Sequence, residues 1–199
     1  MKTAMFGGSF DPIHNGHVSL AKAFVETLGL ERVLIIPTFY PPHKQKKTTV
    51  TSEQRLEMCR LAFEGEELFE VSDIEIRREG KSYTYMTLEE LSELYPDDEL
   101  YLITGADMFM TIDEWKNPEI IFSHAVICGV PRNDDDISDL REKAKKLSAM
   151  GARTEILDPR IMTVSSTEIR RRVSDGESIS GLVPPLVEDY IIKNGLYAD

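Results

Sequence analysis

Two histidines three residues apart are the part of this sequence best suited to chemistry. His14 and His17 close the segment Gly7–His17 (GGSFDPIHNGH), which joins a short apolar run to a helix-like run. Gly7 and Gly8 lack a Cβ, so backbone N–H groups there can approach a phosphate closely. The unpaired N–H groups of a helix N-terminus also favour an anion, and two imidazoles on one face of a turn can donate hydrogen bonds to phosphoryl oxygens without taking up a proton. The segment therefore predicts a phosphate site.

Two other interpretations of this segment are weaker. A glycine turn with two solvent-facing histidines leaves unexplained why three of only four histidines fall within the first 43 residues. A metal site needs a third ligand at a suitable spacing, and Asp11 alone is weak evidence for one. Neither the phosphate loop G-x-x-x-x-G-K-[ST] nor the dinucleotide fingerprint G-x-G-x-x-G is present.

Three consecutive arginines near the C-terminus supply a second candidate. Successive helical residues point about 100° apart, so Arg170, Arg171 and Arg172 cannot all face one ligand. Arg170 stands three residues after Thr167 and shares a helix face with that hydroxyl. Among the three arginines we therefore expect Arg170 to bind an anion.

A run of lysines after residue 43 has both a structural and a functional interpretation. Three lysines in a loop usually form a solvated charged surface, and we assign Lys46 and Lys47 to such a surface. Lys44 directly follows a Pro-Pro-His turn, and it is the candidate ligand.

Four further side chains also have a structural alternative. Trp115 is the only tryptophan, and its polar neighbours favour partial exposure in a loop over burial. Thr84 can begin a helix as a cap, a role compatible with presenting backbone N–H groups to a carboxylate. Asp107 either caps the helix after Gly105 or binds a ribose hydroxyl beyond a parallel strand. His124 has no evident partner, and we assign it a structural role only.

The elements that must position these residues alternate between strand and helix. Short joins between such elements indicate a doubly wound, mainly parallel sheet with helices on both faces. Ligands of such sheets bind beyond the carboxyl ends of the strands, at the switch point. After residue 160 only helices are expected, so we predict a single domain over 1–199 with a small helical appendage over 160–199. The expected strands are 3–6 (stopped by Gly7–Gly8), 33–36, 69–76, 100–104, 125–130 and 154–157; the expected helices are 17–28 (ended by Gly29), 52–63 (capped by Ser52), 86–95, 137–150, 166–173 and 186–194.

Length and charge limit the class of protein. The 199 residues carry a net charge of −12, which argues against a broad nucleic-acid or anionic-membrane surface. Residues 1–60 carry 8 basic and 5 acidic side chains, whereas residues 61–160 carry 11 and 24. An anion site is therefore expected near the two chain ends. Cys59 and Cys128 predict buried thiols in a reducing compartment, and with no signal or membrane-spanning segment expected we assign the chain to the cytoplasm.

With these motifs in order, the sequence resembles the nucleotidyltransferase superfamily that carries the H-x-G-H motif. The version G-G-x-F-D-P-x-H is similar to that of the bacterial nicotinate-mononucleotide adenylyltransferases, and the resemblance covers nearly the whole chain. The segments that carry it are Gly7–His17, Pro41–Lys44 (PPHK), Ser82–Tyr85, Gly105–Asp107, Trp115, Val164–Arg170 (VSSTEIR) and the ending Val183-Pro184 … Gly195-Leu196-Tyr197. Two departures are Val164 in place of Ile, and Pro131-Arg132-Asn133, which retains only the arginine of the family's Arg-Pro-Gly.

The resemblance implies a Rossmann-like enzyme that transfers AMP from ATP to nicotinate mononucleotide, giving deamido-NAD and pyrophosphate in NAD biosynthesis. It implies His17 at the α-phosphate, with His14 and Arg170 completing the catalytic group. Magnesium would be held by the ATP phosphates and water, with no protein side chain as ligand. The implied ATP-binding residues are Gly7, Gly8, Ser9, Phe10, His14, His17, Gly105, Asp107, Ser165, Thr167 and Arg170; the implied mononucleotide-binding residues are Lys44, Tyr83, Thr84, Trp115 and Arg132.

Three alternatives to this function stay open at this point. Another superfamily adenylyl- or cytidylyltransferase, for example one acting on phosphopantetheine, shares both phosphate motifs. A nucleotide-sensing module without catalysis, or an RNA-ligand enzyme with a similar histidine motif, is less consistent with the motifs, length and charge. The expected partners are ATP and the mononucleotide, not nucleic acid or membrane. The sequence leaves open a homo-oligomer and the choice between nicotinate and nicotinamide.

Overall fold

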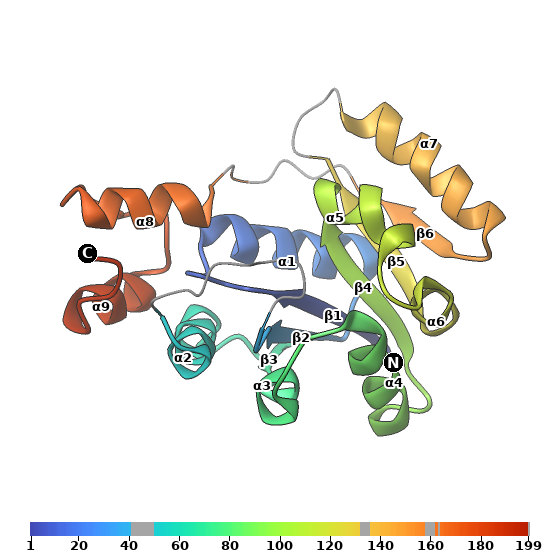
Figure 1. Cartoon of the computed structure of the whole chain (residues 1–199), viewed down its shortest axis with the longest axis horizontal. Helices are drawn as coiled ribbons and strands as arrows, with labels where there is room; N and C mark the ends of the chain where they lie inside the picture. Colours follow the sequence, from blue (N-terminus) through green and yellow to red (C-terminus); the bar gives the residue numbers. More distant parts are fainter. Residues whose placement is uncertain (41–49, 132–135, 158–161, 163, 199) are drawn as a thin grey trace.

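One parallel sheet forms the centre of the computed structural model, with the strand order β3-β2-β1-β4-β5-β6 (Figure 1). The structure describes residues 1–40, 50–131, 136–157, 162 and 164–198. All described pairings between neighbouring strands are parallel, which confirms the predicted doubly wound sheet. The strands are β1 (Lys2–Gly8), β2 (Arg32–Pro37), β3 (Phe69–Val71), β4 (Glu99–Gly105), β5 (Ala125–Val130) and β6 (Arg153–Ile156).

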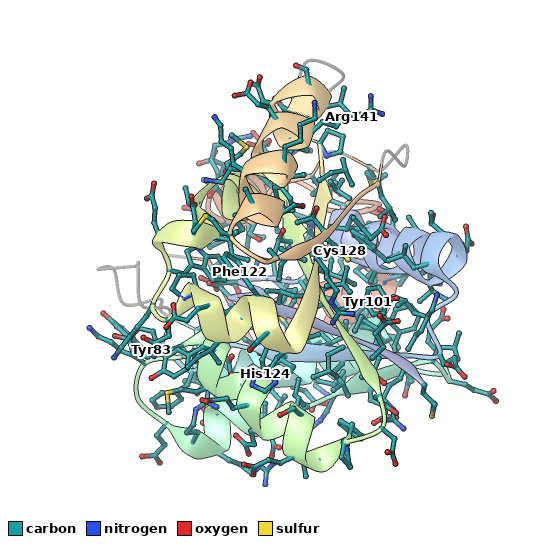
Figure 2. All side chains as sticks on the ribbon, turned by 90° about the vertical axis from the view of Figure 1, so that its right-hand side faces the viewer. Tyr83, Tyr101, Phe122, His124, Cys128 and Arg141 are labelled. Carbon is teal, nitrogen blue, oxygen red and sulfur yellow. The ribbon has the colours of Figure 1, made fainter. Side chains whose placement is uncertain are left out.

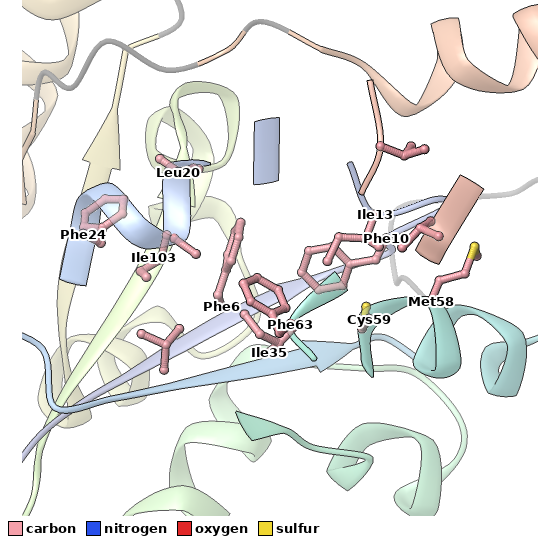
Figure 3. Close-up of a cluster of buried hydrophobic side chains, with 14 of the residues drawn as sticks. Phe6, Phe10, Ile13, Leu20, Phe24, Ile35, Met58, Cys59, Phe63 and Ile103 are labelled. Atoms are coloured by element: carbon pink, nitrogen blue, oxygen red, sulfur yellow. The ribbon is translucent and has the colours of Figure 1, made fainter. Parts of the chain in front are cut away.

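Helices cover both faces of this sheet and enclose one apolar cluster on each. Side chains of α1, α2, α8 and α9 pack in the first cluster, and those of α3 to α7 with η1 pack in the second. Successive strand residues point to opposite faces, so Ile35 belongs to the first cluster and Ile36 to the second. Figure 3 shows the first cluster, where Phe24 of α1 and Met58 of α2 join Phe6 of β1. The helical segments are α1 (Asn15–Leu28), α2 (Ser52–Ala62), α3 (Ile74–Arg78), α4 (Thr84–Leu94), α5 (Ala106–Thr111), η1 (Ile112–Glu114), α6 (Pro118–His124), α7 (Asp136–Ala149), α8 (Ser166–Ser174) and α9 (Pro185–Lys193).

The segment 69–76 differs most from the prediction of a single strand. Only β3 pairs with β2, and it is an edge strand as expected. The backbone N–H of Ser72 donates the last bond to Ile35, after which Arg77 N–H donates to the Asp73 carbonyl and starts α3. Ile74 and Ile76 fit a helical turn as well as an alternating strand, and with Ile74 buried the chain turns helical here.

Several element boundaries also differ. β1 continues through Gly7 and Gly8, which pair with Ile36 and Pro37, so the glycines do not stop the strand. α2 is capped by Thr51 rather than Ser52, since the Thr51 hydroxyl accepts a bond from Gln54 N–H at 3.2 Å. These shifts are of one or two residues, as is usual at element ends.

Three short helical segments lie between β4 and β5, where the sequence pattern gives no bounds. α5, η1 and α6 are too short for apolar periodicity to reveal. Asn117 adopts the left-handed region at φ 53° and separates η1 from α6, which begins at Pro118. These segments carry Trp115 and the residues around it.

The C-terminal helices α8 and α9 add no strand; they lie at one end of the molecule beside α1 and α2, and their buried side chains join the first cluster (Figure 1). Ile169 of α8 and Val187 and Ile191 of α9 are buried in the first cluster. Cys59 and Cys128 are both buried and unpaired in the same cluster, as predicted. Among the described residues, no helix is long and apolar enough to span a membrane.

Candidate active site

The strand order reverses between β1 and β4, and a cavity lies at this switch point. Its volume is about 600 Å³, and residues at the carboxyl ends of both strands line it. Such a position is where open α/β sheets bind ligands. Seven of the residues predicted from the sequence line the cavity: Gly7, Gly8, Ser9, Tyr83, Thr84, Gly105 and Trp115.

His14 and His17 together cap the N-terminus of α1, because the ring of each accepts a hydrogen bond from the backbone N–H of the other. His14 is the N-cap, and its Nδ1 accepts a bond from the His17 N–H at 3.3 Å. The His17 Nδ1 in turn accepts from the His14 N–H at 3.3 Å. The two rings stack with centroids 3.6 Å apart. The prediction that both rings share one face of a turn is therefore confirmed, although the helix begins at Asn15 rather than His17.

This arrangement fixes the protonation of both rings. A neutral imidazole whose Nδ1 accepts a hydrogen bond carries its proton on Nε2. Burial lowers the pKa of His14 to about 4. Burial, with a smaller effect of the His14 charge, lowers the pKa of His17 well below its usual range. Phe6 and Phe10 pack against the His17 ring, which explains its loss of water. At neutral pH both residues are therefore uncharged donors through Nε2.

The lowered pKa values predict a specific pH dependence of stability. The unfolded chain protonates these histidines near pH 6.5, whereas the folded protein keeps them neutral to lower pH. The unfolded state thus binds more protons between about pH 6.5 and about pH 4. We expect the free energy of unfolding in urea to decrease as the pH falls through this window. We also expect the His14 proton signal, identified by its loss in His14→Gln, to titrate near pH 4. A His14 midpoint at the unperturbed value would contradict this.

Gly16 between the two histidines is required by close packing. A Cβ on Gly16 would lie 2.9 Å from the backbone carbonyl of Met162 and 3.1 Å from His14 Nδ1. Real Cβ atoms do not approach backbone this closely, so any other residue would push the histidine segment away from the C-terminal chain. The glycine thus permits contact between the two ends of the sequence.

Side chains of α8 hold the segment before α1. Arg170 Nη1 donates to the Asp11 carbonyl at 2.6 Å, and Ser166 Oγ donates to the Pro12 carbonyl at 2.9 Å. Arg170 Nη2 donates to Thr167 Oγ1 at 3.2 Å, as their predicted shared face requires. Ser165 is the N-cap of α8, its hydroxyl accepting from the Glu168 N–H. The expected approach of the two distant ends is therefore confirmed.

The neighbouring arginines have other partners. Arg171 pairs with Glu168, Asp175 and Glu177, and Arg172 pairs with Glu168. Of the three consecutive arginines, only Arg170 has a described bond to the N-terminal segment. This agrees with the choice of Arg170 from helical geometry.

Other predicted residues lie apart from the cavity. Phe10 is buried, at 3% exposure, and packs edge-on against Phe6 and His17. Asp107 lines a separate, smaller hollow together with Asp136 and Asp139 of α7. His124 is the last residue of α6, a helix that contacts α4, β5 and η1 (Figure 2). Lys44 and Arg132 lie outside the described residues.

The start of α4 and the residue after η1 bring Tyr83, Thr84 and Trp115 to the cavity. Tyr83 is the N-cap of α4, so the first turn of that helix, beginning at Thr84, faces the cavity. Tyr83 lies at one edge of the molecule, well apart from Tyr101 and Cys128 in the sheet (Figure 2). Trp115 follows η1 and is half-buried, and its Nε1 donates to Thr111 Oγ1 at 3.4 Å. An indole held in this way offers a flat surface to a ring.

Arg55 is a buried site residue that the sequence analysis missed. It is only 4% exposed, and its guanidinium donates to the carbonyls of Ser9 and Thr38, each at 2.6 Å, and of Phe39 at 3.3 Å. It therefore joins the chain after β1 to the chain after β2. The available signal was its spacing from the buried Met58 and Cys59, three and four residues further along α2.

Asp11 and Glu75 are two further buried acids near the site. Asp11 Oδ1 accepts a bond from the Tyr197 hydroxyl at 2.8 Å, and this contact ties the end of the chain to the histidine segment. Burial, followed by the Asp11 charge, raises the pKa of Tyr197. Glu75 lines the cavity, and its Oε1 accepts a bond from Thr87 at 2.7 Å. Burial raises the pKa of Glu75, which favours its neutral form.

Comparisons with known proteins agree with this geometry. The family model described as cytidylyltransferase-like matches residues 5–172. A probable nicotinate-nucleotide adenylyltransferase of Dictyoglomus thermophilum is 43% identical over 198 residues, covering 99% of this chain and all of that one. One of Clostridium tetani is 39% identical over 197 residues, covering 98% of each chain. The solved nicotinic acid mononucleotide adenylyltransferase of Plasmodium falciparum, complexed with NaAD, has the same fold, with a TM-score of 0.79, 20% identity and coverage of 99% and 98% of the two chains.

Proposed function

Because this chain belongs to the cytidylyltransferase-like family, among relatives named nicotinate-nucleotide adenylyltransferases, we propose that it transfers AMP from ATP to nicotinate mononucleotide. A phosphate oxygen of the mononucleotide attacks the α-phosphorus of ATP. The bond from that phosphorus to the oxygen bridging to the β-phosphate breaks, and pyrophosphate leaves. The products are deamido-NAD and pyrophosphate, and the reaction is a step of NAD biosynthesis.

The observation that carries this proposal is a pair of neutral histidine donors, with Arg170 bonded to the Asp11 carbonyl, on the segment that continues from the cavity-lining Gly7, Gly8 and Ser9. A phosphate oxygen is already a nucleophile, so the reaction needs alignment and charge stabilisation rather than a strong base. Histidines with depressed pKa values are weak bases, and with Nδ1 bonded to a backbone N–H each ring donates through Nε2. The chemistry of the site thus matches what direct transfer requires.

We assign one group of residues to ATP and a second group to the acceptor mononucleotide. His17 donates to the α-phosphate in the transition state, and His14, Ser165, Thr167 and Arg170 hold the β- and γ-phosphates. Gly7, Gly8 and Ser9 support the phosphates from the backbone that lines the cavity. The adenosine half lies toward Gly105 and Asp107. The pyridine half lies toward Tyr83, Thr84 and Trp115, with Lys44 and Arg132 as proposed ligands of the acceptor.

Magnesium is part of this proposal as a companion of ATP. Both Nδ1 atoms of the histidine pair accept hydrogen bonds from backbone N–H groups, and Asp11 Oδ1 accepts one from the Tyr197 hydroxyl. Because these atoms already have partners, we propose that the phosphates of ATP, and not these side chains, hold the magnesium ion. The part of the chain that the structure describes holds no group of three or more His, Cys, Asp or Glu arranged for a metal. When bound, the ion neutralises charge on the triphosphate.

The proposal also covers the cell compartment, the domain organisation and the partners of the protein. Two buried free thiols suit a reducing compartment, so we place the protein in the cytoplasm. We propose that the whole of 1–199 acts as one nucleotidyltransferase domain, with 160–199 as a helical subdomain. The buried side chains of α8 and α9 belong to the first apolar cluster, which supports that arrangement. ATP and nicotinate mononucleotide are its proposed partners, and a homo-oligomer is compatible with them.

Pyrophosphate release tests the proposed function directly. The purified chain is given ATP and magnesium with nicotinate mononucleotide, nicotinamide mononucleotide or phosphopantetheine, each in a separate reaction. We expect turnover with the pyridine mononucleotides, and highest kcat/KM with the nicotinate form. Turnover with phosphopantetheine alone would assign a different transferase, and ATP binding without turnover of any acceptor would assign a sensing module.

Trp115→Ala is expected to act on only one substrate. Removing the indole eliminates the stacking surface for the pyridine ring, a contact worth about 1 kcal/mol. The KM for nicotinate mononucleotide should therefore rise about fivefold, while the KM for ATP stays nearly unchanged. Steady-state kinetics with each substrate varied in turn provide the measurement. An equal rise in both KM values would argue against ring stacking.

A further inference from the structure

Asp11 carries a buried carboxylate that lies between two side chains from the C-terminal part of the chain. Its Oδ1 accepts a hydrogen bond from the hydroxyl of Tyr197, a residue that is also buried, at 2.8 Å. Its Oδ2 lies 3.9 Å from Arg170 Nη1, which donates instead to the Asp11 backbone carbonyl at 2.6 Å. The carboxylate is thus bonded to a neutral hydroxyl, while the arginine beside it is bonded to a neutral carbonyl.

This separation of Asp11 from Arg170 affects how the arginine can bind an anion. A direct pair of a carboxylate and a guanidinium is charge-assisted and strong, and it would occupy N–H donors that a phosphate needs. The Arg170 side chain is 36% exposed, whereas that of Asp11 is 5% exposed. The arginine is therefore within reach both of the buried carboxylate and of a ligand that arrives from solvent.

Arg55 is a second cation near Asp11, and its hydrogen bonds go to other groups. Its guanidinium donates to three backbone carbonyls and attracts the Asp11 carboxylate only through its charge. Among the residues that the structure describes, Tyr197 alone donates a hydrogen bond to that carboxylate. The orientation of the Asp11 carboxylate therefore depends on the Tyr197 hydroxyl.

From this geometry, and on the basis of the proposed function, we propose that Tyr197 is a positioning residue for ATP. Its hydroxyl holds the Asp11 carboxylate away from Arg170 and so keeps the guanidinium free for the β- and γ-phosphates. Without the hydroxyl, Asp11 Oδ1 would be buried without its donor, which is costly. The carboxylate would then turn toward Arg170 Nη1, already 3.9 Å from Oδ2, and form a direct ion pair that competes with the phosphates.

Tyr197→Phe tests the proposal, because it removes only the hydroxyl and keeps the ring in the first apolar cluster. Calorimetry measures the Kd of two ligands, an unreactive ATP analogue with magnesium and AMP, which lacks the β- and γ-phosphates. The Kd of the ATP analogue should rise about tenfold, as for one lost charge-assisted hydrogen bond. The Kd of AMP should change by less than twofold. A merely structural role of Tyr197 would weaken both ligands alike.

Asp11→Asn provides the second test, because it removes the charge that attracts the guanidinium and keeps the shape of the side chain. In the Asp11→Asn background, adding Tyr197→Phe should change the Kd of the ATP analogue by less than twofold. The two substitutions are therefore expected to be strongly non-additive, as for residues that act through one contact. A tenfold loss in both backgrounds would mean that the hydroxyl acts without the carboxylate, and would overturn the proposal.

The matched control is Tyr190→Phe, which removes a hydroxyl from a residue of α9 that packs against the same cluster. The Tyr190 hydroxyl forms no hydrogen bond with another described residue, so both ligands should bind within twofold of the wild type. Equal losses for the ATP analogue and AMP with Tyr197→Phe would overturn the proposal, and so would unchanged affinities. If ATP binding depends on Tyr197 in this way but the wild-type chain releases no pyrophosphate with any acceptor, the proposed function is refuted and this inference stands.

Discussion

His17→Ala should lower kcat by roughly 100- to 1000-fold, the usual effect of removing one preorganised donor from a developing charge. The KM for ATP should change by no more than about threefold, because the contact strengthens mainly in the transition state. The structure gives the physical reason, since the His17 Nδ1 is occupied by the His14 N–H and the uncharged ring can present only Nε2–H. Steady-state and single-turnover rates of pyrophosphate release provide the measurement.

Two controls separate this effect from damage to the fold. His17→Ala also removes an acceptor at the start of α1, which costs about 1 kcal/mol of stability for a typical cap. Kinetics are therefore measured well below the unfolding temperature of the variant. His124→Ala removes a histidine at the end of α6, away from the motif, and should leave kcat within about twofold. A loss from His17→Ala confined to KM would refute the transition-state role.

The chemistry of the site could be predicted from the sequence wherever it depends on local spacing. Thr167 and Arg170, three residues apart, fall on a shared face because helical geometry places them there. His14 and His17 have the same spacing, which lets the N-cap and the third helical residue bond each other's backbone and stack their rings. The parallel sheet follows from alternating elements with short joins. The same local rules separated Arg170 from Arg171 and Arg172, whose partners are acidic residues of α8 and the turn after it.

Contacts that depend on distant parts of the chain could not be predicted. Nothing in the sequence near Gly16 indicates that the Met162 carbonyl lies where its Cβ would be. The bond from Tyr197 to Asp11 spans 186 residues. The segment 69–76 became strand and then helix because only its first three residues reach β2, which a local pattern of Ile74 and Ile76 does not reveal. Tertiary packing decided each of these features.

The residue with the largest unpredicted effect on stability should be Arg55. Arg55→Met keeps much of the side-chain volume but leaves the carbonyls of Ser9, Thr38 and Phe39 without the donors they now have. Unsatisfied buried groups cost about 1–3 kcal/mol each, and breaking a buried charged network costs about 3–5 kcal/mol in total. We therefore expect the free energy of unfolding to fall by about 3 kcal/mol, measured by urea denaturation with an unchanged m value.

Arg60→Met is the matched control for Arg55→Met, because it makes the same substitution one and a half turns along α2. The Arg60 side chain is 52% exposed and pairs only with Glu57, at 3.5 Å, among the residues with described ion pairs. An exposed pair of this kind contributes little, so the control should change stability by less than about 0.5 kcal/mol. Because Arg55 holds the chain after β1 that carries Ser9, its loss should also loosen the phosphate segment and lower kcat below the unfolding transition. A loss of stability no larger than that of the control would mean that water replaces the guanidinium at the three carbonyls, and that the buried arginine does not organise the switch point.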